Sequence, residues 1–193
     1  MGRWAPDARG RLEQAALDLF AQQGYEATMV DQIAQRAGLT KRTLFRHFAD
    51  KRETLFGGQD ALARLFAEGI AEAPEDADPA EMLDSALRAV ARILDAQRWE
   101  LARRRAPIIA ANEPLREREL YKRVALRAVL GDALRERGIP KLAASLHATL
   151  GVLAFSTAFA RWLEPDHHEG FDQIASQTLT EILTSAAALG KRR

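Results

Sequence analysis

The sequence predicts an all-α chain of about nine helices, with a small three-helix head followed by a larger helical body. Pro and Gly divide the chain into stretches whose apolar residues have helical spacing, and no stretch alternates as a strand does. We find no internal repeat. The predicted head comprises residues 1–50 and the predicted body residues 51–193, with residues 51–73 as a linking helix.

The head begins with a predicted support helix from Arg9 to Gln23. Its apolar residues lie on one stripe, and the helical pattern stops at Gly24. The stripe consists of Leu12, Ala15, Ala16, Leu17 and Phe20. We expect Phe20 and Tyr25 to close the core of the head.

The stretch from Thr28 to Lys51 predicts two short helices joined by a tight turn. Gly38 stands where the turn needs a residue that tolerates positive φ, and Thr40 can accept a hydrogen bond from the free N–H groups of the second helix. Leu44 and Phe48 are expected to anchor that helix from its inner side. The first helix has small and apolar residues on one face: Ile33, Ala34 and Ala37.

The outer face of the second helix is rich in cations. From Arg36 to Arg52, six Lys or Arg side chains stand against the single acid Asp50, a local excess that suits phosphate. Such a cluster is more often a solvated surface. The ordered Ala-Gly-Leu turn before it nevertheless indicates a helix-turn-helix that binds double-stranded DNA.

The same spacing resembles the tetracycline-repressor (TetR) family of one-component regulators. The resemblance is carried by Thr28, Ile33, Ala34, Ala37, Gly38, Thr40, Lys41, Leu44, Phe45, His47, Phe48 and Lys51. Two positions depart from it, since Arg42 stands where many members have Gly and Phe45 where many have Tyr. The resemblance is specific over about the first sixty residues. For the rest it implies a helical body that dimerises and binds a small, often hydrophobic ligand.

We expect the head to divide its DNA contacts between phosphates and bases. The candidate phosphate contacts are Thr28, Lys41, His47 and Lys51. The candidate base contacts are Arg42, Thr43 and Arg46, with Arg preferring guanine. Thr40 and Phe45 complete the set, although packing explains Phe45 equally well. Two heads in a dimer would place their second helices in successive major grooves of a near-palindromic site.

The predicted body starts with a fourth helix from Lys51 through Ile70, capped by Asp50 and weakened at Gly57-Gly58. Further helical segments are residues 80–98, 99–111, 114–137, 141–163 and about 171–189. The last two are poor in charge and therefore need burial on several sides. We expect them to pair with their copies in a homodimer, as the resemblance also implies.

The body also has enough large apolar side chains to line a cavity for an unknown small-molecule effector, although core packing explains any one of them as well. The candidates are Phe66, Ile70, Trp99, Arg103, Tyr121, His147, Phe155 and Phe159. We interpret the run Arg103-Arg104-Arg105 as solvated, with contact to an acidic ligand as the alternative. The stretch from Trp99 to Arg118 resembles members thought to sense acyl-type or other lipophilic molecules.

Composition limits the other classes. With 28 basic and 27 acidic residues, attraction to DNA must come from local clustering, which argues against a nonspecific architectural DNA-binding protein. Zero cysteines exclude a disulfide framework and a thiol switch. His167 and His168 would supply at most part of a metal shell, so we expect no metal and no cofactor. No nucleophile elbow, phosphate loop or two-histidine helix occurs, so we expect no enzyme.

We expect no membrane span, because no uninterrupted apolar stretch approaches the needed length, and the start MGRWAPDARG lacks the core of a signal peptide. The expected location is therefore the cytoplasm. The expected function is a repressor that a small hydrophobic effector releases from its operator. An effector that tightens operator binding would make it a corepressed or ligand-activated regulator instead.

Overall fold

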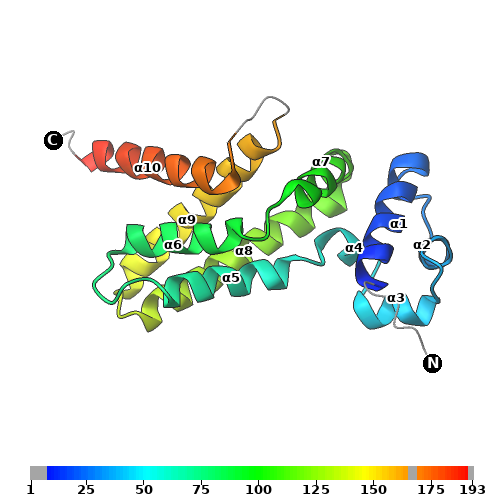
Figure 1. The fold of residues 1–193 in the computed structure, drawn as a ribbon, viewed down its shortest axis with the longest axis horizontal. Helices are drawn as coiled ribbons and strands as arrows, with labels where there is room; N and C mark the ends of the chain where they lie inside the picture. Colours follow the sequence, from blue (N-terminus) through cyan, green and yellow to red (C-terminus); the bar gives the residue numbers. More distant parts are fainter. Residues whose placement is uncertain (1–7, 165–168, 191–193) are drawn as a thin grey trace. The chain divides into compact units, whose positions relative to one another are not determined.

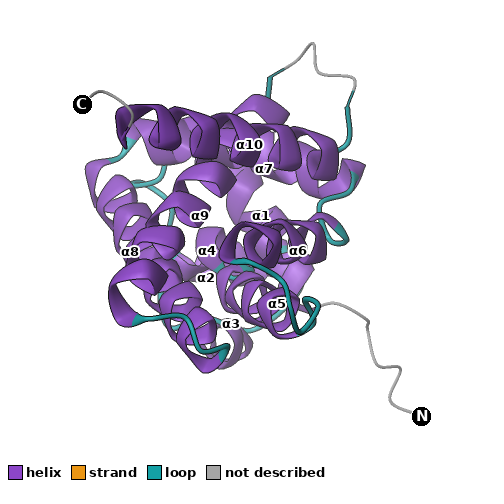
Figure 2. Ribbon diagram, turned by 90° about the vertical axis from the view of Figure 1, so that its left-hand side faces the viewer, coloured by secondary structure: helices purple, strands orange, loops and turns teal. Residues whose placement is uncertain are grey.

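The computed structural model describes residues 8–164 and 169–190, and all regular secondary structure in these residues is helical (Figures 1 and 2). Its ten helices are α1 (Ala8–Gln23), α2 (Val30–Arg36), α3 (Lys41–His47), α4 (Glu53–Phe56), α5 (Gln59–Ala71), α6 (Pro79–Ala91), α7 (Ala96–Ala111), α8 (Glu113–Glu136), α9 (Lys141–Trp162) and α10 (Phe171–Gly190). The all-α prediction is confirmed. Its number of helices agrees when the short α4 is joined to α5.

The chain forms two compact units. The first contains the residues up to 59 together with residues 100–119, and the second contains residues 60–99 and the residues from 120 onward. Helices α7 and α8 therefore contribute residues to both units. The functional boundary predicted at residue 50 stays a prediction.

The core of the first unit is built on α1. Leu12 is fully buried there, and the Phe20 and Tyr25 rings pack with their centroids 5.2 Å apart, as predicted. The same apolar cluster also contains Ile109 of α7 and Leu115 of α8, which are 3% and 0% exposed. The core of the head thus includes residues far along the chain, which the sequence reasoning had assigned to the body.

The predicted fourth helix from Lys51 through Ile70 is interrupted at Gly57-Gly58, the point where the glycines are expected to weaken it. Helix α4 ends at Phe56, and α5 begins only after the Gly57-Gly58 turn. A Cβ added at Gly57 would lie 2.8 Å from Cε1 of Phe48, so the close approach of that ring requires a glycine. The helix breaks at these two glycines, a residue type with low helix propensity.

In the second unit, α5 and α6 approach each other closely. A Cβ added at Gly69 would lie 2.6 Å from Cα of Ala86. The predicted helix boundary between residues 98 and 99 is wrong, because α6 ends at Ala91 and α7 begins at Ala96. The carboxylate of Asp95 accepts a hydrogen bond from the backbone N–H of Arg98 at 2.8 Å, and this cap starts the new helix earlier.

Helix α9 corrects one sequence-based expectation. By length and composition alone it is apolar enough to cross a membrane, with a mean hydropathy of 1.5 over its most apolar window. In the second unit it packs against α6 and α10. Ala144, Ala148, Ala154 and Ala158 are all buried, and a Cβ added at Gly151 would lie 2.7 Å from a Leu83 methyl carbon. These small residues let one side of α9 pack closely against its neighbours in the second unit.

Candidate nucleic-acid interface

The turn between α2 and α3 has the geometry that the sequence predicts. Gly38 has a φ of 65°, and a Cβ there would lie 2.8 Å from Nη2 of Arg11, which itself donates a hydrogen bond to the Ala37 carbonyl. Thr40 caps α3, since its Oγ1 accepts a hydrogen bond from the backbone N–H of Thr43 at 3.1 Å. The turn and the cap together fix where α3 starts.

Helix α3 presents two unlike faces. Leu44 and Phe48 lie on the inner side and are 0% and 3% exposed, as predicted. The outer side exposes Lys41, Arg42, Phe45 and Arg46. Phe45 is 48% exposed, so packing against its neighbours does not account for it.

Lys51 and Thr28 are both turned into the first unit. The Lys51 ammonium donates hydrogen bonds to the carbonyls of Tyr25 and Thr28, at 2.7 and 3.0 Å, and lies 4.1 Å from the centre of the Tyr25 ring. Thr28 is 1% exposed and donates its hydroxyl to the Gly24 carbonyl at 2.7 Å. Burial lowers the pKa of Lys51, while nearby Glu26 partly opposes this. These bonds fix the start of α2, and the phosphate contacts predicted for both residues stay predictions.

Tyr25 itself has a strongly perturbed hydroxyl. Burial, the largest cause, raises the pKa of Tyr25 to about 12, although the positive charge of Arg52 acts in the opposite direction. Lys51 therefore lies over a neutral ring at physiological pH. The contact between the Lys51 ammonium and the Tyr25 ring is therefore an attractive cation–π interaction.

Asp18 on α1 joins three helices through its carboxylate. It accepts hydrogen bonds from Arg104 of α7 at 2.5 Å and from Arg36 of α2 at 3.5 Å, and a third from Gln14 at 2.9 Å. Burial acts to raise the pKa of Asp18, but the hydrogen bonds from Arg104 and Gln14 and the two positive charges outweigh it, so the pKa is lowered. Arg36 is thus bound within the first unit. We call the side chains that hold this unit's helices together its framework.

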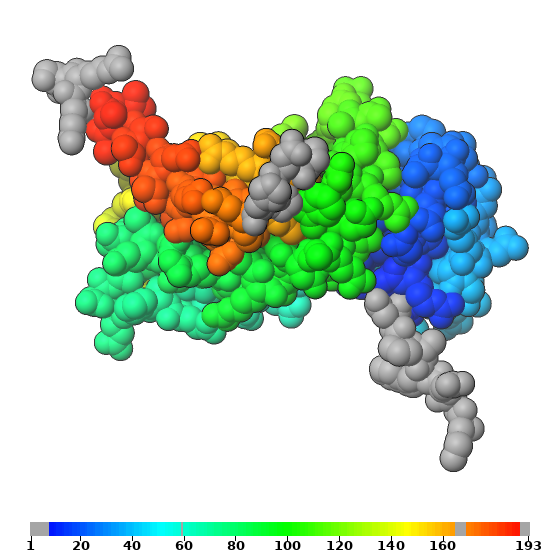
Figure 3. Space-filling view, turned by 45° about the horizontal axis from the view of Figure 1, so that its top comes forward, coloured from blue at the N-terminus to red at the C-terminus, as the bar shows by residue number. Residues whose placement is uncertain are grey.

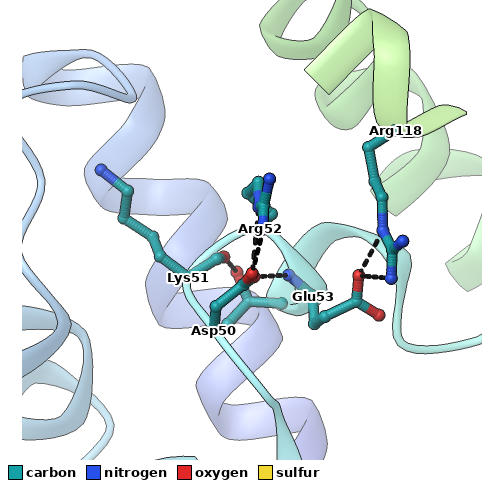
Figure 4. Close-up of polar contacts among 6 residues, drawn as sticks. Asp50, Lys51, Arg52, Glu53 and Arg118 are labelled. Atoms are coloured by element: carbon teal, nitrogen blue, oxygen red, sulfur yellow. Dashed lines mark hydrogen bonds and ion pairs between the residues drawn. The ribbon is translucent and has the colours of Figure 1, made fainter. Parts of the chain in front are cut away.

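A second set of charges surrounds the start of α4 (Figure 4). Arg52 donates to the Asp50 carboxylate at 2.6 Å, and Asp50 also accepts the backbone N–H of Glu53 at 3.0 Å. This bond confirms that Asp50 stabilises the helix start, although Arg52 holds the N-cap position. Arg118 of α8 donates to the Glu53 carboxylate at 2.7 Å, which ties α8 to this corner.

The structure thereby divides the six cations of the cluster. Arg36, Lys51 and Arg52 are bound within the first unit. Lys41 forms an exposed ion pair with Asp31 at 3.1 Å, a kind of pair that contributes little to stability. Within the part of the chain that the structure describes, no hydrogen bond or ion pair engages Arg42 or Arg46. Those two guanidinium groups remain available to a partner.

Two other predicted contacts, Thr43 and His47, have mixed surroundings. The Oγ1 atoms of Thr43 and Thr40 lie 2.9 Å apart and share a hydrogen bond. His47 is half-buried, and its Nε2 has no hydrogen-bond partner among the described residues although it is buried. A buried nitrogen without a partner costs free energy. In this rotamer Nε2 cannot reach a phosphate outside the protein.

The structure brings several predicted effector residues together in the second unit. The Phe66 and Phe155 rings meet edge to face with centroids 5.3 Å apart, and Phe159 lies 5.7 Å from Phe155. Phe171, which the sequence reasoning did not single out, extends this aromatic cluster at 5.9 Å from Phe155. Phe66 and Ile70 are both fully buried, so each also serves as core.

The remaining effector candidates lie in surroundings that differ from one another. Arg103 belongs to the first unit, Tyr121 is 64% exposed on α8, and Nδ1 of His147 lies 2.8 Å from the Ala143 carbonyl oxygen. Trp99 donates its indole N–H to the Trp162 carbonyl at 2.8 Å. It also lines a cleft of about 370 Å³ whose walls are Leu94, Asp95, Ala96, Trp99, Trp162, Gly170 and Phe171.

Two of the three arginines in the run from Arg103 to Arg105 are bound within the first unit. The solvated interpretation of the run is wrong for Arg104, which binds Asp18, and for Arg105, which donates to the Leu55 carbonyl at 3.0 Å. No signal short of the tertiary fold distinguishes such arginines from solvated ones. His167 and His168 lie outside the described residues. Among the described residues, no group of three potential ligands could hold a metal ion.

Met29 is an exposed residue beside α2 that the sequence reasoning missed. Its side chain is 65% exposed, and its backbone N–H donates to the Gln32 side chain at 2.8 Å. An apolar residue directly before a short, polar helix was the available signal. Met29 and Phe45 are the two large apolar side chains that the described part of the first unit exposes most.

Comparison with known proteins gives matches of two kinds. Residues 13–56 match the family of bacterial regulatory proteins called the tetR family. The chain is 39% identical over 82 residues to the transcriptional regulator TcmR of Streptomyces glaucescens, a match that covers 42% of this chain and 36% of TcmR. The matches thus span between about a fifth and somewhat over a third of the length of these curated relatives.

Similar solved structures cover nearly the whole chain. The TetR family transcriptional regulator PfmR of Thermus thermophilus is 28% identical, with a TM-score of 0.50 over 90% of this chain and 97% of PfmR. The regulator FadR of Bacillus subtilis, solved in complex with stearoyl-CoA, has a TM-score of 0.60 at 18% identity, over 91% of this chain and 97% of FadR. At 18% identity, this likeness shows that FadR and this chain have the same fold and shows nothing further.

Proposed function

We propose that the chain is a TetR-type, sequence-specific transcriptional regulator that binds a near-palindromic operator as a homodimer; its match to the tetR family over residues 13–56 and its likeness to TcmR and PfmR support this. One observation carries the proposal. On α3, Arg42 and Arg46 are exposed and have no partner among the described residues, while Arg36, Lys51 and Arg52 are bound in the framework. The protein would act in the cytoplasm, by binding and without turnover.

In this proposal the contacts differ in kind. Arg42 and Arg46 read guanine edges in the major groove, since a guanidinium can donate two parallel hydrogen bonds to O6 and N7. Lys41 holds a phosphate, because its exposed pair with Asp31 is easily exchanged for a stronger anion. Lys51 and Thr28 support the start of α2, and any phosphate contact they add must coexist with their present hydrogen bonds.

Exposed leucines on α9 support the proposed dimer. Leu142, Leu146 and Leu153 are 85%, 55% and 48% exposed, and their spacing of four and seven residues puts them on one side of the helix. In Figure 3, atoms of α10 also lie at the surface of the second unit. A second copy of this chain would cover the leucines across a two-fold axis.

The dimer is tested by placing charge on that side of α9. We expect Leu146→Glu combined with Leu153→Glu to give monomers in sedimentation velocity at concentrations where the parent is dimeric. Leu120→Glu on α8, at a position 58% exposed, is the matched control and should leave the dimer intact. A dimer that survives the α9 changes would rule out this interface.

We further propose that a small hydrophobic effector controls DNA binding from the second unit. The aromatic cluster of Phe66, Phe155, Phe159 and Phe171 supports an apolar ligand. FadR, which shares the fold, binds stearoyl-CoA. Such a ligand shifts the equilibrium only if it binds the DNA-competent and DNA-incompetent states with different affinity. A ligand that prefers the competent state would make the protein a corepressed or activated regulator.

The central experiment is selection of bound genomic fragments followed by footprinting. We expect the protein to retain one family of near-palindromic fragments in an excess of random DNA, with protection over two half-sites about one helical turn apart or a multiple of it. Uniform retention of all fragments would instead indicate an architectural DNA-binding protein and would overturn the proposal.

A further inference from the structure

We propose that Phe45 contacts the C5-methyl group of a thymine in each half-site, as a specificity contact between those of Arg42 and Arg46. This inference rests on the proposed operator binding and names one base that the site reads. Thymine is the only base that carries a methyl group in the major groove.

The exposure of Phe45 is not explained by the fold. In the seven residues of α3, the apolar side chain Leu44 is 0% exposed, and Phe48 directly after the helix is 3% exposed, whereas Phe45 is 48% exposed. The core therefore does not need a large ring at this position. An exposed ring in a monomer gains free energy when a partner covers it.

The neighbours of Phe45 determine what that partner is. Arg42 precedes it by three residues and Arg46 follows it, so two exposed cations flank the ring on the outer side of α3. Neither guanidinium has a partner among the described residues. Two free positive charges beside an apolar ring complement the major groove, which offers phosphates, guanine acceptors and the thymine methyl.

The chemistry of the ring narrows the contact further. A phenylalanine has no atom that donates or accepts a conventional hydrogen bond, so Phe45 can neither bind a phosphate nor read the polar edge of a base. Nearby Thr40 and Thr43 are hydrogen-bonded to each other. The apolar contact that remains in the groove is the methyl group of thymine.

The first test removes that methyl group from DNA. In the selected operator, each thymine of one half-site is replaced in turn by deoxyuridine, and affinity is measured by fluorescence anisotropy. We expect one position at which methyl removal weakens binding by the parent about fourfold, the effect of one buried methyl-sized group, and about fifteenfold when both half-sites are changed. Phe45→Ala should bind more weakly and lose this dependence, whereas Phe45→Tyr, which keeps the ring, should retain it.

Met29 supplies the matched control, because it is the other strongly exposed apolar side chain of the first unit. Met29→Ala should keep the methyl dependence of the parent. Equal methyl dependence in the parent and Phe45→Ala, loss of the dependence in Met29→Ala, or the absence of any methyl effect in the parent would each overturn the inference.

A second measurement needs no variant. With 5-iodouracil at the sensitive thymine, irradiation should crosslink the DNA to the peptide that contains Phe45, as identified by mass spectrometry. A crosslink to Met29, or to any residue outside α3, would contradict the assignment. Failure to select any operator would instead overturn the proposed function and this inference with it, so the two failures are distinguishable.

Discussion

The two units of this chain expose opposite kinds of surface. The first leaves the guanidinium groups of Arg42 and Arg46 available on a short helix, whereas the second leaves leucines such as Leu142 and Leu146 exposed on a long one. Exposed unpaired cations attract an anionic polymer, and exposed leucines are stabilised by another apolar surface. From this difference we propose that the first unit binds DNA and that the second unit binds a second copy of the chain.

The cations of the first unit also fall into two groups, those bound to a carboxylate and those without a partner among the described residues. Arg36, Arg52 and Arg104 bind carboxylates of the framework, and they sit in the same kind of basic stretch as Arg42 and Arg46. Local charge density is therefore a poor guide to function. What separates the two groups is whether a carboxylate of the framework lies within reach.

The largest effect should come from removing both free guanidinium groups. We expect Arg42→Ala combined with Arg46→Ala to weaken binding to a selected operator at least on the order of a thousandfold, since the dimer loses four bidentate contacts of about 1–3 kcal/mol each, with a smaller effect on random DNA. Fluorescence anisotropy with both DNAs measures this. The control Lys41→Ala should weaken both DNAs alike and lower the salt slope by about one. A larger loss of specificity in the control would reverse the assignment.

The next effect tests whether the end of α7 and the start of α8 stabilise the first unit. Leu115 is fully buried in the core cluster that contains Phe20, so Leu115→Ala should cost about 2–5 kcal/mol of unfolding free energy, measured by denaturant titration. Amide exchange in α1 should accelerate as well. The exposed Leu120→Ala should change stability by less than about 0.5 kcal/mol. Unchanged amide exchange in α1 would show that the end of α7 and the start of α8 do not stabilise the head.

A substitution of Lys51 distinguishes a structural role of this residue from a contact to a DNA phosphate. Lys51→Met removes the hydrogen bonds to the Tyr25 and Thr28 carbonyls and should lower the free energy of unfolding by about 1–2 kcal/mol. If Lys51 also holds a phosphate, the salt dependence of operator binding should become shallower by about one unit. An unchanged slope would leave Lys51 with the framework role alone.

The smallest effect concerns the pH dependence of stability. Because the pKa of Asp18 is lowered in the folded state, its contribution is present above the ordinary value of 3.8 and is lost as the pH falls through the lowered one. Asp18→Asn should therefore cost about 1 kcal/mol near neutrality and make the acid-induced loss of stability less steep. Asp31→Asn, in an exposed pair, is the control and should do neither. Parallel pH profiles for the parent and Asp18→Asn would contradict this role.

Several elements could be predicted from the sequence because their determinants are local. The positive φ of Gly38, the cap by Thr40 and the buried stripe of α1 each depend on residues within a few positions of one another. The full break at Gly57-Gly58 could not be predicted, because a glycine pair weakens a helix without always ending it. The early start of α7 was missed because Asp95 was not recognised as a cap.

The amino-acid sequence was sufficient to identify an all-α chain and a helix-turn-helix with a cationic second helix. Helical periodicity, turn residues and local charge all depend on residues that are close together in the sequence. Only the tertiary structure could show that Ile109 and Leu115 complete the core of the head, or that Arg104 binds Asp18 while Arg42 and Arg46 have no partner among the described residues. These distinctions depend on contacts between residues far apart in the chain. An ion pair or a buried ring exists only once folding has brought its two members together.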